Sequence, residues 1–444
     1  MTERTGGSDV SRTETLARKL NNYEISECEA KGLTEDAVGN PLGPWRLDGF
    51  KWFSSATDSD MAMLLARTSK GLSLFFIPLR RRVSAGPSPE RSPTELNGIR
   101  LQRLKDKLGT KGLPTAELEI HGARGWLIGE EGKGVKEIST LFNITRIHTA
   151  TGSAAFWARA LAVCRAFSKS RETRGEVLYK NLHHASWMAG ETVKYRAAAH
   201  LSLFGPALLG CNEQGWEQTT ADTPAKHLIP RDRRTREVLL RLLTPVMKAQ
   251  VSVGAVSGVR AAMECLGGVG YCENNEDGGI LNLAKILRDS MVNTIWEGTV
   301  SVMAEDVGRV LSDKRVGDGN VIANVFAPWV RGVLAHCNDS FPNEVLVVEE
   351  RLEELQRVVH GITILELQWR GREIMEHLEA ITASTLLLFD ARTDANEVAC
   401  HVATRWVWSR ALSTSKHHQA QRDWRQEAAI DQSIFLGSKL KRLG

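Results

Sequence analysis

The sequence predicts an α+β protein: an antiparallel β-domain followed by a helical bundle and a helical C-terminal extension. Two observations carry this prediction. Near residue 130 the hydrophobic period changes from short β-rich runs, broken by Gly, Asp, Ser and Pro, to the spacing of amphipathic helices. The chain is also 444 residues long, enough for two or three domains with their own cores. We place the domains at 1–130, 131–314 and 315–444.

The first domain is predicted to be built from strands. They are expected at 45–47, 50–54, 61–66, 72–79 and 116–120. Residues 80–94 contain several Pro and Gly breaks and are expected to form a polar loop. Because no helical segment separates the strands, the pattern favours an antiparallel sheet over a βαβ series.

The remainder of the chain is predicted to be helical. Apolar residues recur at helical spacing from Lys133 onward. Helices are expected at 152–168, 177–204, 235–266, 279–291 and 300–312, with a polar surface loop at 205–232. An apolar stripe between Leu346 and Leu365 predicts further helix in the extension.

Composition is typical of a soluble globular protein, with 42% hydrophobic and 25% charged residues. The net charge of +4 does not by itself imply nucleic acid. The seven cysteines are scattered without metal-ligand spacing, as in an intracellular protein with reduced thiols. No apolar stretch reaches the length of a membrane span. We expect a cytoplasmic location; mitochondrial and peroxisomal locations stay open because the true N-terminus could be missing.

Glu297 is the strongest candidate for a catalytic residue. It lies between the predicted helices 279–291 and 300–312. A carboxylate at such a junction is near free backbone N–H groups and the positive end of a helix dipole. It is also held rigidly, as a proton-abstracting base must be. The alternative is that Glu297 only complements the dipole while Thr299 caps the following helix.

Five motifs, in order, resemble those of the acyl-CoA dehydrogenase family. They are Thr2 to Asp9, with its Thr-Glu and Gly-Ser-Asp; Gly49-Phe-Lys-Trp-Phe-Ser54; Lys107-Leu-Gly-Thr-Lys-Gly112; Leu266-Gly-Gly-Val-Gly-Tyr271; and Ile295-Trp-Glu-Gly-Thr299. The segments 103–109 and 263–268, with the long extension, resemble the branch named for the bacterial DNA-alkylation response. In the family a helical domain precedes the first motif, on which Met1 falls here. The resemblance therefore implies a chain without that domain.

The resemblance implies FAD as the cofactor, an acyl-CoA or related thioester as substrate, and a homodimer or homotetramer. It implies that Glu297 is the base and that the cofactor is bound by Thr2, Ser8, Trp52, Ser54, Arg171, Gly267, Gly268 and Thr299. In the family, the glycine turn meets the flavin nucleotide of a neighbouring subunit. The sequence departs from the family pattern at Glu264, where Gln is usual, and at Arg174, where Phe is usual.

Strand geometry adds to this interpretation. Trp52 and Ser54 alternate along one predicted strand and should face the same side. An aromatic ring and a hydroxyl suit the flat, polar-edged flavin ring, although Trp52 would equally suit a sandwich core. The loop holding Thr2 and Ser8 could equally be a plain turn, and is expected to fray because it lies at the N-terminus.

Other chemistry has little support. The run Gly267 to Gly270 follows a helix rather than a strand, so it suits a glycine-terminated helix better than a dinucleotide fingerprint. The sequence lacks His-Glu-x-x-His, Cys-x-x-Cys, a phosphate loop and Gly-x-Ser-x-Gly. Metal, nucleotide-hydrolase and serine-hydrolase sites are therefore not expected.

Charge in the extension is split. Residues 339–400 hold 5 Lys/Arg against 13 Asp/Glu, a net of −8, whereas residues 401–444 hold 8 against 3, a net of +5. Weak, salt-sensitive DNA contact is predicted through Arg405, Arg410, Lys416, Arg422 and Arg425. The alternative is a solvated helical face.

Three functions remain open from the sequence. The first is an acyl-CoA dehydrogenase-like oxidoreductase in which Glu297 removes the α-proton of a thioester while a hydride passes to FAD. The second is a DNA-associated flavoprotein of the alkylation-response type. The third is a truncated, inactive interaction protein. A yellow colour of the purified protein would distinguish the two flavoprotein functions from the inactive interaction protein. A salt-dependent gel shift with duplex DNA would distinguish the DNA-associated flavoprotein from the oxidoreductase.

Overall fold

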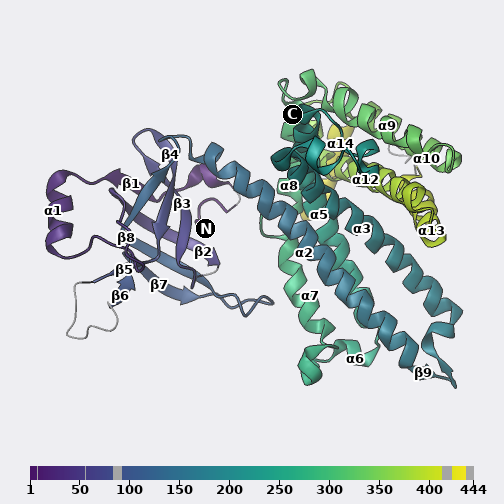
Figure 1. Cartoon of the computed structure of the whole chain (residues 1–444), viewed down its shortest axis with the longest axis horizontal. Helices are drawn as coiled ribbons and strands as arrows, with labels where there is room; N and C mark the ends of the chain where they lie inside the picture. The colour runs from purple at the N-terminus through teal and green to yellow at the C-terminus, as the bar shows by residue number, and fades with distance from the viewer. Residues whose placement is uncertain (8, 56, 84–92, 413–422, 437–444) are drawn as a thin grey trace. The chain divides into compact units, whose positions relative to one another are not determined.

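The computed structural model describes residues 1–7, 9–55, 57–83, 93–412 and 423–436. It divides into two compact units, Met1–Ile144 and Thr145–Gly444, which are described separately (Figure 1). One hydrophobic cluster in the second unit runs from Ile147 to Ala411 and so includes residues of both predicted helical domains. The division into three domains stays a prediction.

The first unit is built around one sheet of six strands in the order β2-β1-β3-β4-β8-β7. Its strands are β1 (Leu16–Lys19), β2 (Trp45–Ser55), β3 (Met61–Thr68), β4 (Gly71–Pro78), β7 (Ile99–Leu104) and β8 (Thr115–Ile128). A pairing of β2 with β8 closes the ring of strands. The strand pairs are antiparallel, as predicted, except that β1 meets β3 in parallel through Leu16 and Arg67. A small hairpin of β5 (Arg80–Arg82) and β6 (Thr94–Leu96) stands beside the sheet.

Alternation of apolar side chains explains the sheet's core. Leu47, Phe75, Ile77 and Ala123 are fully buried inside it. Because successive strand residues point to opposite faces, each strand contributes every second side chain to this interior. The longest strand, β8, pairs with β2, β4 and β7. The predicted strand at 116–120 lies inside it, but β8 extends further in both directions.

The helix α1 (Asn22–Ala30) was not predicted. It has a capping box, in which the Asn21 side chain accepts from the Glu24 N–H and the Glu24 carboxylate accepts from the Asn21 N–H. None of its residues is buried. Without a buried face it carries no apolar periodicity, so only the Asn-x-x-Glu spacing signals it in the sequence.

The second unit is helical and is entered through α2, which spans the boundary between the units. Its helices are α2 (Gly134–Ser170), α3 (Leu182–Gln214), α4 (Trp216–Thr219), α5 (Arg233–Cys265), α6 (Gly268–Tyr271), α7 (Leu283–Met291), α8 (Val300–Ser312), α9 (Ala327–Cys337), α10 (Pro342–Val359), α11 (Ile364–Trp369), α12 (Gly371–Asp394), α13 (Glu397–Trp406) and α14 (Trp424–Leu436). The short strands β9 (Glu172–Thr173) and β10 (Glu176–Val177) form a hairpin between α2 and α3.

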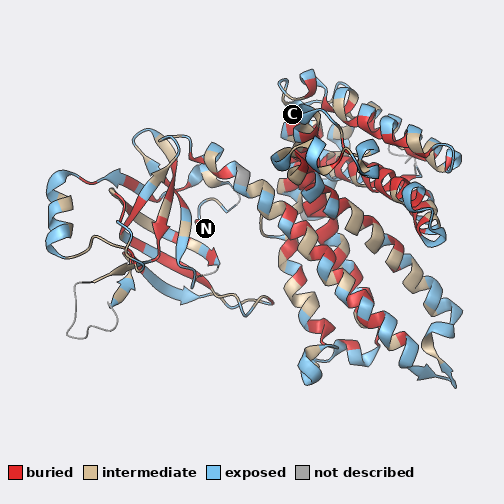
Figure 2. Cartoon of the chain, in the orientation of Figure 1, coloured by how far each residue is buried: buried red, intermediate tan, exposed pale blue. Residues whose placement is uncertain are grey.

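Two helices carry most of this core. Buried positions run along α5 and α12 in Figure 2. The α5 helix packs against α3, α7 and α8, and α12 packs against α3, α9, α10 and α13. By length and composition α5 could cross a membrane, but 72% of its apolar window is buried inside the protein, as in any core helix.

The predicted loop at 205–232 was partly wrong. The α3 helix continues through Gly205 and Pro206 to Gln214, and α4 follows it. A Cβ on Gly205 would lie 3.1 Å from Sδ of Met247 and 3.3 Å from Cγ1 of Ile147. Gly205 therefore serves close helix packing rather than helix termination, and the burial of the flanking side chains outweighs the hydrogen bond lost at Pro206.

Candidate active site

Glu297 sits in the connection between the 3₁₀ turn Val292–Thr294 and α8. Its φ of +57° is left-handed, a conformation that costs a non-glycine residue free energy and is found disproportionately at functional sites. Gly298 follows at φ +101°, and a Cβ there would lie 2.5 Å from Cε of Met303. Thr299 then caps α8, its hydroxyl accepting from the Val302 N–H. The backbone thus fixes where the Glu297 side chain leaves the chain.

A hydrogen bond fixes the other end of that side chain. The Thr145 hydroxyl, on α2, donates to Oε2 of Glu297 at 2.6 Å. Glu297 is half-buried, so its carboxylate is sheltered but reachable. Rotamer and backbone are both restricted, which is the condition for a positioned general base.

Lys248, on α5, is a buried cation that contacts this turn. Its side chain is fully buried, and its ammonium donates to the carbonyl of Gly298 at 2.5 Å. Burial lowers the pKa of Lys248 to about 8, although the negative charge of Glu297 opposes this shift. The ammonium thus ties the Glu297 turn to α5.

Stability should depend on this lysine at alkaline pH. Because the folded-state pKa of about 8 lies below the ordinary 10.5, the unfolded chain binds the extra proton between these values. Stability should therefore rise with pH across that window, by about 3 kcal/mol at 1.36 kcal/mol per pKa unit. The Lys248→Met variant should lack this rise in urea unfolding, whereas Lys285→Met, on an exposed side chain, should keep it. Parallel pH profiles for parent and Lys248→Met would contradict the assignment.

An ion-pair network holds together the helices around Glu297. The carboxylate of Asp306, on α8, is buried and accepts a hydrogen bond from Arg146 of α2 at 2.6 Å. It also accepts from both Nη atoms of Arg241 of α5, at 2.9 and 2.7 Å. Burial alone would raise the pKa of Asp306, but Arg241 and then Arg146 outweigh it and lower the pKa to about 2. Arg146 directly follows Thr145, so the network also sets the position of the Glu297 partner.

In the first unit, the N-terminus is tied to β2 rather than frayed. Thr2 exchanges backbone hydrogen bonds with Trp52 and Phe53. The next residue, Glu3, is buried and pairs with the ammonium of buried Lys51 at 2.5 Å. Thr2 and Glu3 therefore do not show the fraying that was expected of this loop. Ser8, a predicted cofactor ligand, lies outside the described residues.

Trp52 and Ser54 do not follow the expected alternation. The register between β2 and β8 shifts between Lys51 and Ser54, so one extra residue is inserted at this point of the strand. Ser54 is completely buried, whereas Trp52 is half-buried with the Lys105 ammonium 3.1 Å from its ring centroid. The Ser54 hydroxyl has no hydrogen-bond partner among the described residues. Such an unsatisfied buried hydroxyl needs an explanation, and a bound polar group supplies one.

The other predicted cofactor residues gather at one end of the helical unit. Arg171 is exposed just after α2, and Gly267 and Gly268 lie just after α5, near the ends marked β9 and α6 in Figure 1. Gly267 has a φ of +62° and ends α5 as predicted. A Cβ on Gly267 or Gly268 would meet nothing within 4 Å, so this turn offers open backbone.

The predicted DNA-contact residues are only partly described. Lys416 and Arg422 lie outside the described residues. Arg410 already pairs with Glu379 at 2.8 Å, and Arg425 lies 3.8 Å from Asp423. Arg405 is exposed on α13. Contact with DNA stays a prediction.

Sequence reasoning missed the residues that hold the Glu297 turn and the helices around it. Thr145, Lys248 and Asp306 come from three helices far apart in the chain, and a single sequence does not pair them. One signal was available: Lys248 is the sole charged residue between Arg241 and Arg260, in an otherwise apolar and small-residue segment. A lone charge in a buried helix marks a partnered or functional group.

Comparison with known proteins places these two units in a family. Residues 1–123 match the model "Acyl-CoA dehydrogenase, middle domain" and residues 132–312 match "Acyl-CoA dehydrogenase, C-terminal domain". The chain is 34% identical to acyl-CoA dehydrogenase family member 11 of Caenorhabditis elegans, covering 93% of this chain and 61% of that protein. It is 35% identical to the putative acyl-CoA dehydrogenase AidB of Escherichia coli, covering 73% and 50%. The chain thus spans about half to three fifths of these curated relatives.

Solved structures of acyl-CoA dehydrogenases are also similar to this chain. The crystal structure of Caenorhabditis elegans ACDH-11 in complex with C11-CoA superimposes with a TM-score of 0.78 at 30% identity, over 99% of this chain and 68% of that one. An acyl-CoA dehydrogenase from Bacillus anthracis, complexed with FAD, shares the fold with a TM-score of 0.69 at 16% identity, over 100% and 72%. Two matching family models and a similar structure establish that this chain belongs to the acyl-CoA dehydrogenase family.

Proposed function

We propose that this protein is an FAD-dependent oxidoreductase that acts on an acyl-CoA thioester, with Glu297 as the base. Glu297 would take a proton from the carbon next to the thioester carbonyl. A hydride from the following carbon would pass to the flavin, which supplies the redox chemistry when bound. The thioester substrate class is supported by the C11-CoA complex of the similar ACDH-11 structure.

The observation that carries this proposal is the restraint on Glu297. Its backbone is held at a left-handed φ by the Gly298 turn and the α8 cap, and its carboxylate is held by Thr145. A carboxylate that merely complemented the α8 dipole would need neither the costly backbone nor the second anchor. A rigid, half-buried carboxylate is what proton abstraction from a carbon acid requires.

The residues of the first unit fit the polar edge of a flavin. Ser54 offers a buried hydroxyl that lacks a partner among the described residues. Trp52 stays proposed as an aromatic contact, although the bulge before Ser54 removes the alternation that would place both side chains on one face. FAD is also the ligand of the Bacillus anthracis structure with the same fold. Ser54 would bind a polar edge atom of the ring, and Trp52 would bind its apolar surface.

The turn at Gly267 and Gly268 lies too far along α5 from Glu297 for one small ligand to contact both. Lys248, which contacts the Glu297 turn, precedes Gly267 by 19 residues, about 28 Å at 1.5 Å per helical residue. This separation supports a homo-oligomer in which Arg171, Gly267 and Gly268 contact a dinucleotide bound by a neighbouring copy.

Within the family we place the chain in the alkylation-response branch. The 35% identity to AidB supports this placement. A cytoplasmic location and DNA contact through the basic end of the extension remain further proposals of the same kind.

Replacing Ser54 by alanine tests the cofactor site without requiring turnover. Without FAD, the Ser54→Ala chain should be as stable as the parent or more stable, because an unsatisfied buried hydroxyl is removed. FAD should raise the melting temperature of the parent more than that of the variant, consistent with an affinity loss of about 10-fold for one hydrogen bond. Thermal melts with a range of FAD concentrations measure both effects.

Ser55→Ala is the matched control, because Ser55 is exposed and its hydroxyl lies 3.2 Å from that of Thr115. It should leave the FAD response unchanged. Equal losses in both variants would remove Ser54 from the cofactor site. A parent chain whose melting temperature ignores FAD would contradict the flavin proposal itself.

A further inference from the structure

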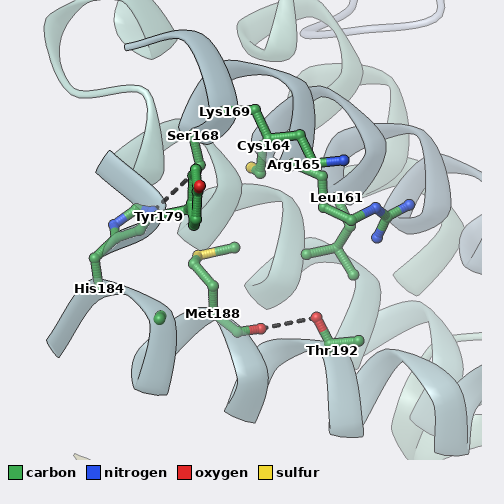
Figure 3. A pocket seen from close by; sticks show the side chains of 10 residues that line it. Leu161, Cys164, Arg165, Ser168, Lys169, Tyr179, His184, Met188 and Thr192 are labelled. Atoms are coloured by element: carbon green, nitrogen blue, oxygen red, sulfur yellow. Dashed lines mark hydrogen bonds between the residues drawn. The ribbon is translucent and has the colours of Figure 1, made fainter. Parts of the chain in front are cut away.

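A cavity of about 240 Å³ opens between α2 and α3, away from the Glu297 turn (Figure 3). Apolar Leu161 and Met188 line it, together with the exposed residues Arg165 and Lys169. Two chemically reactive side chains, Cys164 and His184, also line it. Nothing in the proposed dehydrogenase reaction uses these groups.

A second cysteine lies behind the cavity wall. Cys265, in the last turn of α5, has its Sγ 3.8 Å from Nε2 of His184 and 3.9 Å from Oγ of Ser168. Ser168 and His184 are themselves 3.0 Å apart, the contact drawn in Figure 3. A thiol, an imidazole and a hydroxyl thus form a closed triangle.

The two cysteines are neighbours, although 101 positions separate them in the sequence. The Cys164 thiol donates to the carbonyl of Ala262, one turn before Cys265, at 3.5 Å, and Ser168, one turn after Cys164, has its hydroxyl 3.9 Å from the Cys265 sulfur. Both cysteines are free and belong to one hydrophobic cluster, with exposed fractions of 1% and 6%. Each thiol is therefore shielded from bulk solvent but lies at or just behind the wall of a cavity that a small molecule can enter.

The electrostatics give the two sulfurs different roles. Interaction with Cys164, helped by Ser168, lowers the pKa of Cys265 despite its burial, whereas interaction with Cys265 and burial raise the pKa of Cys164. Burial also lowers the pKa of His184, so its ring is neutral near pH 7 and can accept a proton. Burial, by contrast, raises the pKa of Cys337 to about 11.

We propose that Cys265 and Cys164 form a peroxide-reactive dithiol, in which hydrogen peroxide enters through the α2–α3 cavity, oxidises Cys265, and Cys164 closes a disulfide. The Cys265 proton goes to His184, and the thiolate sulfur attacks one peroxide oxygen. The O–O bond breaks, and the departing hydroxide takes the proton from His184 to give water and a cysteine sulfenic acid.

The second step uses the neighbouring thiol. The Cys164 sulfur attacks the sulfenic sulfur, the S–O bond breaks, and hydroxide leaves with the Cys164 proton as a second water. Two thiols lose two electrons in total, and one peroxide is reduced to two waters. The disulfide would link α2 to the end of α5, two residues before the Gly267 turn. The proposal does not depend on the dehydrogenase function.

Peptide mass spectrometry of the peroxide-treated full chain tests the proposal. The tryptic peptide 261–285 contains both Cys265 and Cys272, so the parent for this experiment carries Cys272→Ser. Peroxide should convert peptides 160–165 and 261–285 into one disulfide-linked species with loss of both free thiols, and dithiothreitol should reverse the change. This measurement needs no substitution in the core.

Two variants in that background separate the steps. Cys164→Ser should abolish the linked peptide and leave a sulfenic acid at Cys265 that dimedone captures. Cys337→Ser, which removes another buried thiol, should leave the link unchanged. Peroxide treatment that modifies other cysteines while peptides 160–165 and 261–285 stay free would overturn the proposal. A dimedone adduct absent from Cys265 in the Cys164→Ser chain would overturn the assignment of the attacking sulfur.

Discussion

Replacing Glu297 by glutamine is expected to slow reduction of the bound flavin by C11-CoA about 100- to 10,000-fold, the usual contribution of a positioned general base. Glutamine has the same shape and the same number of side-chain torsions, so the left-handed backbone is no more strained than before. Its amide oxygen can still accept from Thr145, at the position where Oε2 of Glu297 accepts now. The substitution therefore removes the proton acceptor and little else. Anaerobic stopped-flow absorbance of the flavin measures the rate.

Glu305→Gln is the matched control, since Glu305 is exposed on α8 and its carboxylate forms an ion pair with the exposed Arg309. It should reduce flavin at the parent rate. FAD content should be equal in all three chains. A Glu297→Gln chain that reduces flavin as fast as the Glu305→Gln chain would move the base elsewhere.

Replacing Asp306 by asparagine should destabilise the helical unit by about 3–5 kcal/mol, the cost of removing one partner from a buried ion pair. The substitution removes the negative charge that balances Arg146 and Arg241, and it replaces one of the two accepting oxygens with an NH2 group that cannot accept from either arginine. Because Asp306 connects α2, α5 and α8, the loss should also loosen the contact between Thr145 and Glu297. Urea unfolding, extrapolated to water, measures the change in the free energy of unfolding.

Two comparisons make this prediction specific. Glu237→Gln, which removes an exposed ion pair with Arg233 on α5, should cost about 0–1 kcal/mol. The pKa of Asp306 is about 2 in the folded chain against an ordinary 3.8, so its stabilisation is present above pH 3.8 and is lost as the pH falls toward 2. The difference between parent and Asp306→Asn should shrink over that range. Equal costs for the two variants at neutral pH would show that the network contributes little.

The sequence predicted the strands and helices well where one face of an element is buried. The runs at 61–66 and 72–79 became β3 and β4, and the run at 300–312 became α8 with its cap at Thr299. It failed where a glycine has a packing role. The helix predicted at 177–204 stops before Gly205, but α3 passes through this residue, because local sequence does not show which side chain will lie against a glycine. The helix predicted at 152–168 is likewise only part of α2, which begins at Gly134.

The candidate site was predicted only where one short segment carries the signal; contacts between distant segments were missed. Glu297 and Thr299 follow from the pattern of one short segment, and so does the glycine at the end of α5. The bulge before Ser54 and the tie between Glu3 and Lys51 depend on pairing between distant segments. Thr145 and Lys248 contact the Glu297 turn, and Asp306 binds Arg146 and Arg241, only when three helices pack, so no local motif announces these contacts.

The central claim, that Glu297 removes the α-proton, is tested most directly by exchange of that proton with solvent. The FAD-loaded chain is incubated with C11-CoA in deuterium oxide without oxygen, and deuterium at the α-carbon is measured by mass spectrometry. Parent and Glu305→Gln chains should incorporate deuterium, and Glu297→Gln should incorporate it about 100- to 10,000-fold more slowly. Incorporation by Glu297→Gln at the parent rate, or none by an FAD-loaded parent, would contradict the account.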